Sequence, residues 1–112
     1  MKLGLTLLFV FFAVSMPAFA SSRDQREHGV TVFKANGCDH CHRIRNEGGH
    51  KGPDLSGVGR KLSKTQIHDQ IMKGGNEMPS FAEDLQKSEV DDLVAYLRSC
   101  RAKPAKKEHK GQ

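Results

Sequence analysis

Hydrophobic residues recur at helical spacing in three stretches of the chain, separated by segments rich in glycine and charge. The clearest stretch is 88–100, where the spacing is the i, i+3, i+4, i+7 pattern of one buried helix face. Its members are Val90, Leu93, Val94 and Leu97. Ser88 is a suitable N-cap, and Asp91 stands three residues later at the capping-box position. We therefore expect a helix that begins at Ser88.

A second helix is predicted over 23–37. Its apolar face comprises Val30 and Phe33, with Val32 at the edge of that face. Gly29 lies one turn before Phe33 on the same side of the helix. Because glycine inside a helix costs about 1 kcal/mol relative to alanine, its presence there suggests that another backbone comes close. Gly37 is a good C-terminal stop.

A third helix is predicted over 63–73. Ser63 and Gln66 have the spacing of a capping box, and Gly74-Gly75 ends the segment. Its expected inner face consists of Leu62, Ile67, Gln70 and Ile71. Residues 43–62 have no convincing period and are predicted to be a loop. We find no alternation typical of a β-strand.

The first twenty residues are predicted to be a cleaved signal peptide. Lys2 precedes an almost wholly apolar run over 3–14, Pro17 interrupts the pattern, and Ala18-Phe19-Ala20 suits signal peptidase. The apolar run is shorter than the ~20 residues that span a bilayer, so no stable membrane span is expected after cleavage. An uncleaved anchor is the alternative. Export from a bacterial cytoplasm, most simply to the periplasm, follows from the cleaved form.

Charge is unevenly distributed. The chain has a formal net charge of +5, but residues 21–100 contain equal numbers of basic and acidic side chains. The excess lies in Lys2 and in a tail, 101–112, which is predicted to be basic and disordered. We therefore expect one small domain over 21–100 and no nucleic-acid partner. A domain of this size is marginal on its apolar core alone, so a buried cofactor would help to complete it.

Cys38, Cys41 and His42 form a Cys-x-x-Cys-His motif, which is typical of covalent c-type haem attachment. The two thiols can add to the two haem vinyl groups, and the histidine that follows can bind the iron. A thioredoxin-like redox pair would need a βαβ context, which the pattern lacks. A zinc site would need a second pair of ligands, and Cys100 stands alone.

The sixth position of the iron has several candidate ligands. Met78 precedes Pro79 in an irregular segment, where a thioether can be presented without a helix in the way. Met72 lies within the predicted third helix and is better suited to packing. His50 and His68 would give bis-histidine ligation instead. The residues alone leave this choice open, and His/Met ligation would give the higher reduction potential.

Taken together, these motifs resemble the class I c-type cytochromes, and the resemblance extends from residue 26 to residue 99. It rests on Cys38-x-x-Cys41-His42, Gly52-Pro53-Asp54-Leu55, Gly57 with Gly59-Arg60, Gly74 to Phe81, and Leu93 to Leu97. The resemblance implies an all-α, cytochrome c-like fold of three or four short helices around one covalent haem. It implies His42 and Met78 as axial ligands. It also implies that the Pro53 carbonyl accepts the proximal imidazole N–H and that Arg60 pairs with a haem propionate.

The function implied is that of a one-electron carrier between redox partner proteins, not an enzyme. Two alternatives are a cytochrome subunit docked permanently to a dehydrogenase or oxidase, and a haem sensor or peroxidase with an open iron position. The chain departs from the family in having no tryptophan and an extra thiol, Cys100. In an oxidising compartment Cys100 could link two chains by a disulfide.

Overall fold

The computed structural model describes residues 13–104, so most of the predicted apolar run in the leader and residues 105–112 of the predicted tail lie outside it. Residues 13–20 contain no helix or strand, and Phe19 is 91% exposed. In chain order the elements are α1 (Ser22–Ala35), the 3-10 helix η1 (Cys38–His40), β1 (Arg43–Ile44), β2 (Glu47–Gly48), α2 (Val58–Lys61), α3 (Lys64–Lys73) and α4 (Lys87–Ser99).

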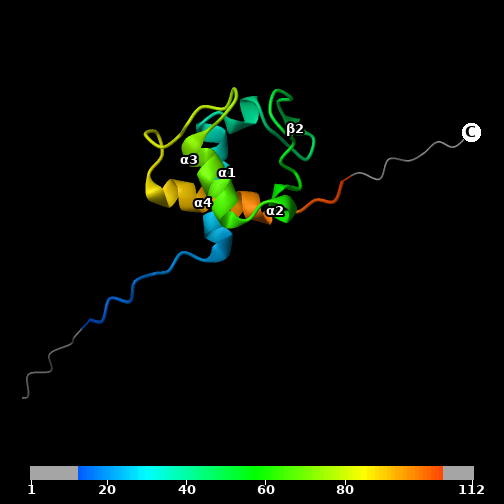
Figure 1. The fold of residues 1–112 in the computed structure, drawn as a ribbon. Helices are drawn as coiled ribbons and strands as arrows, with labels where there is room; N and C mark the ends of the chain where they lie inside the picture. The colour runs from blue at the N-terminus through cyan, green and yellow to red at the C-terminus, as the bar shows by residue number, and fades with distance from the viewer. Residues whose placement is uncertain (1–12, 105–112) are drawn as a thin grey trace, which may run out of the picture.

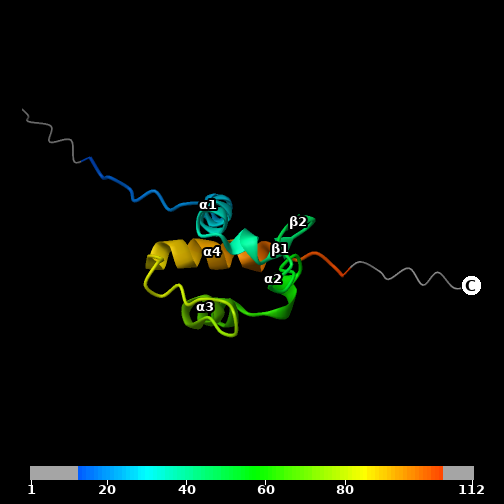
Figure 2. The same cartoon turned by 90° about the horizontal axis from the view of Figure 1, so that it is seen from above.

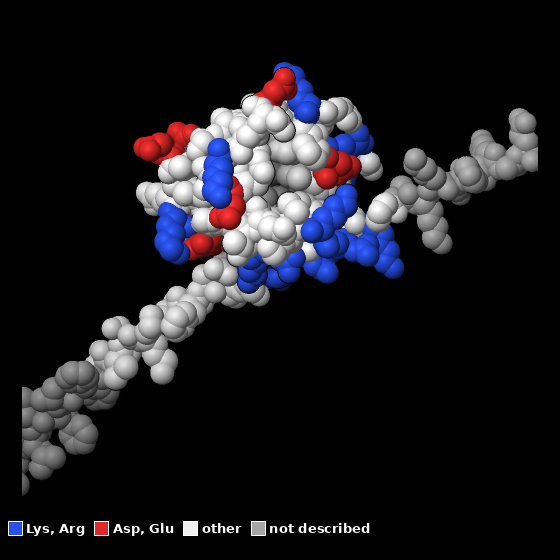
Figure 3. Space-filling view, in the orientation of Figure 1, with Lys and Arg blue, Asp and Glu red and all other residues white. Residues whose placement is uncertain are grey.

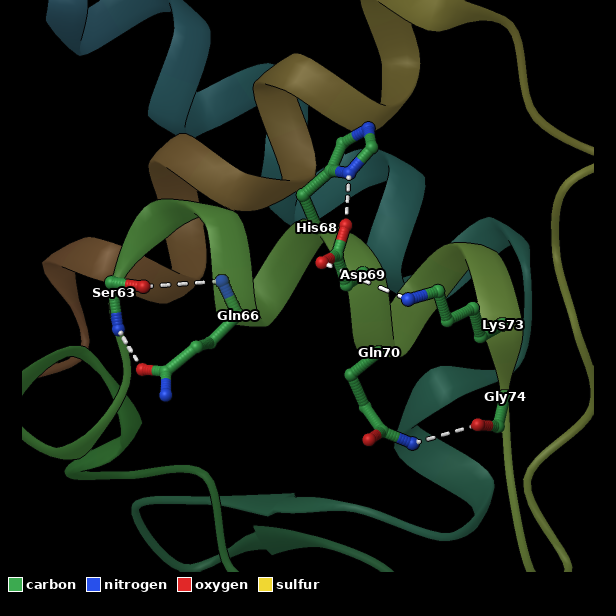
Figure 4. Close-up of polar contacts among 7 residues, drawn as sticks. All are labelled: Ser63, Gln66, His68, Asp69, Gln70, Lys73 and Gly74. Atoms are coloured by element: carbon green, nitrogen blue, oxygen red, sulfur yellow. Dashed lines mark hydrogen bonds and ion pairs between the residues drawn. The ribbon is translucent and has the colours of Figure 1, made fainter.

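The three predicted helices are present, and the all-α architecture is confirmed (Figure 1). The capping box at the start of α3 is also confirmed (Figure 4). Ser63 Oγ accepts the Gln66 N–H at 3.1 Å, and Gln66 Oε1 accepts the Ser63 N–H at 2.9 Å. The predicted start of α4 was wrong, because Gln86 rather than Ser88 is the N-cap. Glu89 reaches back to the Gln86 N–H at 2.8 Å and so stabilises a helix that begins earlier.

Helix α4 lies between α1 on one side and α3 on the other (Figure 2). Gly29 allows α1 to cross α4 closely, since a methyl group there would meet the Asp92 carbonyl and lie 2.6 Å from Tyr96 Cβ. At this crossing the rings of Phe33 and Tyr96 pack edge to face, with centroids 5.8 Å apart. The expected close approach at Gly29 is therefore present.

One apolar core runs through these contacts. Val32 is more deeply buried than Val30, so the inner face of α1 is turned slightly from the predicted one. Gln70, predicted on the inner face of α3, is exposed. The core consists of Val32, Phe33, Val58, Ile67, Ile71, Leu85, Val90, Leu93, Val94 and Leu97.

The segment 43–62, predicted to be a loop, contains a two-residue antiparallel ladder and the four-residue helix α2. Elements this short have too few positions to show a hydrophobic period. Helix α2 is fixed to the end of α4, where Arg98 Nη1 donates to the carbonyls of Gly59 at 2.7 Å and Leu62 at 2.8 Å. The Gly59 N–H in turn donates to the Cys100 carbonyl at 2.9 Å.

Within residues 13–104, none of the helices is both long enough and apolar enough to cross a membrane.

Candidate haem-binding site

The Cys-x-x-Cys-His motif lies in a tight turn directly after α1. Gly37 adopts a left-handed conformation (φ 69°) that ends α1 and turns the chain into η1. The His42 N–H donates to the Cys38 carbonyl at 2.9 Å, which places both cysteines and the histidine on one compact turn. Cys38 is half-buried and Cys41 is exposed. The two thiols and the imidazole are thus brought together as haem attachment requires.

The segment 47–53 wraps this turn closely. The Gly49 N–H donates to the Asp39 carbonyl at 2.9 Å, and the Gly52 N–H donates to the Cys41 carbonyl at 2.8 Å. A methyl group on Gly52 would lie 2.7 Å from Cε1 of His42, and one on Gly49 would meet the His40 carbonyl. The glycines of this segment therefore let its backbone pack directly against the motif.

His42 is oriented by the next residue of the same segment. Its Nδ1 lies 2.8 Å from the Pro53 carbonyl oxygen. Because a carbonyl can only accept, Nδ1 carries a proton, so in the neutral imidazole Nε2 is the nitrogen with the free lone pair. This is the tautomer in which Nε2 can bind a metal while Nδ1–H fixes the ring.

The Cys38 thiol does not resemble that of a reactive redox pair. Burial raises the pKa of the Cys38 thiol to about 11. Reactive Cys-x-x-Cys pairs instead have lowered thiol pKa values, because the thiolate is the attacking species. Among residues 13–104 there is also no cluster of three or more His, Cys, Asp or Glu side chains that could hold a metal ion. The described residues therefore fit neither a redox pair nor a zinc site.

Met78 is presented by a tight turn beyond α3. Gly74 and Gly75 both have positive φ (65° and 147°), and Gly75 pairs with Met78 through two hydrogen bonds of 2.9 and 3.0 Å. Ser80 Oγ donates to the Met72 carbonyl at 2.6 Å and holds the turn against the end of α3. These contacts fix the backbone that carries Met78, and Met78 itself is partly buried.

Gln70 is a residue near the site that the sequence pattern did not identify. Its Nε2 donates to the Gly74 carbonyl at 3.3 Å and lies 3.7 Å from Met78 Sδ. His68 leaves α3 on the other side of the helix from Gln70 and contacts Asp69 (Figure 4). His50 Nε2 lies 3.3 Å from Arg43 Nη1, so it belongs to the same loop region as His42. Of these side chains, only Gln70 contacts the Met78 thioether.

Arg60 is exposed on α2. The Gly59 carbonyl beside it is bound by Arg98 and by Arg101 Nη1, at 2.5 Å for the latter. Sequence reasoning missed Arg98, whose two carbonyl acceptors lie 36 and 39 residues earlier in the chain. The pairing of Arg60 with a haem propionate remains a prediction.

Cys100 is half-buried at the end of α4, and its Sγ lies 3.5 Å from the Tyr96 carbonyl oxygen. Burial raises the pKa of its thiol, which disfavours the thiolate needed for disulfide exchange. These features do not support the disulfide dimer considered above. Cys100 also lines a groove of about 780 Å³ with Phe33, Ile44 and Tyr96, and this groove contains none of the predicted haem ligands.

Comparison with known proteins supports the same assignment. The family described as "Cytochrome C oxidase, cbb3-type, subunit III" matches residues 24–97. Cytochrome c-555 of Methylococcus capsulatus is 36% identical over 91 residues, which cover 80% of this chain and 74% of that protein. Cytochrome c6 of Nostoc is 32% identical, over 77% of this chain and 78% of its own.

The fold is also found in a solved structure. The c-type cytochrome SorU of Sinorhizobium meliloti aligns with a TM-score of 0.60 and 21% identity, over 70% of this chain and 93% of its own. Together with the Cys-x-x-Cys-His turn, these matches show that the chain belongs to the class I c-type cytochromes and carries a covalently bound c-type haem.

Proposed function

We propose that this protein is an exported one-electron carrier whose haem iron is held by His42 Nε2 and Met78 Sδ. In this proposal residues 1–20 are removed, residues 21–100 form the haem domain and 101–112 form a basic tail. The haem supplies an Fe(II)/Fe(III) couple when bound. With both axial positions filled by the chain, no position is left for a substrate, so the protein is not an enzyme.

The hydrogen bond between His42 and Pro53 is the observation that carries this proposal. At 2.8 Å it sets the tautomer that leaves Nε2 free, and it holds the ring without help from the cofactor. A ligand that is already oriented needs little rearrangement when the iron changes oxidation state, which suits a carrier. Cys38 and Cys41 supply the covalent links, and Arg60 is proposed to face a propionate.

The distal ligand is proposed from the way Met78 is fixed. Its turn is closed by its own backbone hydrogen bonds and by Ser80, and Gln70 Nε2 contacts the sulfur at 3.7 Å. His68 leaves α3 away from this turn, and Met72 packs against the core. Met78 therefore has stronger support than the other candidates.

A second candidate function is that of a cytochrome subunit bound permanently to a larger redox complex. One similar protein, the menaquinol:cytochrome c reductase cytochrome c subunit of Bacillus subtilis, is 29% identical over 71% of this chain, but the match covers only 31% of that protein. The match therefore concerns about a third of that subunit. Co-purification with a larger complex from native membranes would favour the subunit, and elution as a single chain would favour the free carrier.

Replacing Met78 by leucine tests the axial assignment, because leucine keeps the side-chain volume and removes the sulfur. In the oxidised holoprotein we expect loss of the weak far-red absorption band that marks methionine sulfur on ferric haem. We also expect rapid binding of cyanide or CO at the freed position. Optical spectra of both oxidation states provide the measurement.

Met72→Leu is the matched control, since it makes the same chemical change at the other methionine of this region. It should keep the far-red band and exclude added ligands. If Met72→Leu lost the band and Met78→Leu kept it, the assignment of Met78 would be wrong. A wild-type spectrum that is high-spin and binds cyanide at once would instead favour a sensor or peroxidase.

Gln70→Leu should lower the reduction potential of the holoprotein. An N–H that donates to the thioether withdraws electron density from sulfur, so its loss favours the ferric state. We expect a several-fold change in the redox equilibrium, on the order of 30–60 mV for one electron. Gln66→Leu, on the same helix, should weaken the α3 cap but leave the potential unchanged. Equal potentials for wild type and Gln70→Leu would show that this contact has no electronic role.

A further inference from the structure

Four cationic side chains outside the proposed haem contacts gather where α2 meets the end of α4. We call this surface the basic face, and its members are Lys61, Arg98, Arg101 and Lys103. Arg98 and Arg101 both donate to the Gly59 carbonyl, so the two guanidinium groups lie side by side. The Ala102 N–H donates to the Ser56 carbonyl at 3.0 Å, which holds the segment that leads to Lys103 against the start of α2. In Figure 3, Lys and Arg side chains gather along the lower edge of the domain, where α2 and the end of α4 lie in Figure 1.

The positive charge of the basic face is largely uncompensated. None of its members forms an ion pair with a carboxylate of a described residue, whereas Lys73 and Lys87 elsewhere are paired with Asp69 and Asp91. The pKa of the Asp54 carboxyl is lowered chiefly by its hydrogen bonds with Ser56, and to a smaller extent by the charges of Arg43 and Lys61. Two adjacent arginines without a carboxylate repel each other, and a surface anion would relieve that repulsion.

The sequence beyond the described residues continues with the same sign of charge. Lys106, Lys107 and Lys110 follow Lys103, with Glu108 as the single acidic residue in that stretch. Clusters of four to eight Lys and Arg side chains are typical of segments that bind anionic lipid headgroups. The four described cations of the basic face already reach that number.

The position and composition of the basic face favour a lipid surface over a protein partner. Figure 1 shows α2 and the end of α4 at the lower edge of the domain, whereas η1 and the turn that carries Met78 lie at its upper edge. Stable protein interfaces have an apolar or aromatic centre. The large exposed hydrophobic residues found within 13–104 are Val14, Met16 and Phe19. None of them belongs to the basic face, which therefore has no apolar centre of this kind.

We propose that the basic face binds the phosphate headgroups of an anionic membrane, which leaves the haem-attachment end free to exchange electrons. The arrangement concentrates the carrier at the membrane without a transmembrane segment. Binding of this kind is electrostatic and is therefore lost at high ionic strength. The proposal does not depend on which side chain is the sixth ligand of the iron.

The test is sedimentation of the mature holoprotein with vesicles of phosphatidylglycerol or of phosphatidylcholine. At low salt we expect binding to the anionic vesicles alone, and release in ~0.5 M salt. The triple variant Lys61→Gln, Arg101→Gln, Lys103→Gln should lose about tenfold or more in affinity, since each cation near an anionic surface contributes several-fold. The haem spectrum of this variant should be unchanged.

A second triple variant, Lys34→Gln, Lys73→Gln, Lys87→Gln, lowers the net charge equally on other exposed positions and should still bind. Equal loss of affinity in both triple variants would overturn the proposal, because net charge rather than the basic face would then explain binding. So would equal binding of the wild type to both kinds of vesicle. Preference for polyglutamate over phosphatidylglycerol at equal charge would also overturn it, in favour of an acidic protein.

Discussion

Gly29→Ala should destabilise the domain by about 2–3 kcal/mol, even though alanine is the better helix former by about 1 kcal/mol. The added methyl group would meet the Asp92 carbonyl and lie 2.6 Å from Tyr96 Cβ, and both belong to the helix that crosses α1. Because a backbone carbonyl cannot move aside as a flexible side chain can, the two helices must separate. Chemical denaturation of the holoprotein measures the loss.

Thr31→Ala on the exposed side of α1 is the control, and it should change the stability by less than ~1 kcal/mol. If Gly29→Ala were as stable as the wild type, or more stable, the gain in helix propensity would outweigh the steric clash where α1 crosses α4. The contact at Gly29 would then not determine the approach of the two helices. For Gly29→Ala, a loss of this size corresponds to a decrease in Tm of roughly 10–20 °C in a domain of this length.

Gly52→Ala should disturb the proximal side of the haem rather than only the stability. The new methyl group would lie 2.7 Å from Cε1 and 2.9 Å from Nδ1 of His42, so the ring must turn away from the Pro53 carbonyl. A ring that loses this hydrogen bond is a poorer and less constrained ligand. We expect a lower fraction of low-spin haem and a shifted potential, measured by optical spectroscopy and redox titration.

Gly57→Ala is the matched control for that experiment. Its methyl group would meet the Ala102 carbonyl oxygen at the same distance, 2.7 Å, but away from the haem motif. Both variants should therefore lose stability, and only Gly52→Ala should change the spectrum and the potential. Identical spectra for the two variants would contradict the proposed link between Gly52 and the imidazole.

Residues that repeat at helical spacing made the long helices predictable. Val90, Leu93, Val94 and Leu97 define a buried face by their period alone, and Ser63 with Gln66 define a cap by local chemistry. The Cys-x-x-Cys-His motif is equally local. These features depend on neighbours within about one or two helical turns, and sequence carries that information directly.

Contacts that depend on how the chain folds back on itself could not be predicted in the same way. Gln70 reaches Met78 only because two glycines with positive φ reverse the chain between them. Arg98 finds its carbonyl acceptors on α2, an element too short to show a period. At the start of α4 two cap positions are available, and at Gln86 the backbone N–H donates a hydrogen bond to the Glu89 carboxylate.

The haem motif is held by contacts between residues close in sequence, so it can form early in folding. The contact between His42 and Pro53 spans 11 residues, whereas the contact between His28 and Asp92 at the helix crossing spans 64. Loop-closure entropy makes the longer connection costlier by about 1.5 kcal/mol. The turn that receives the haem can therefore form before α4 docks. Haem attachment could then take place on an organised acceptor within an otherwise unfolded polypeptide.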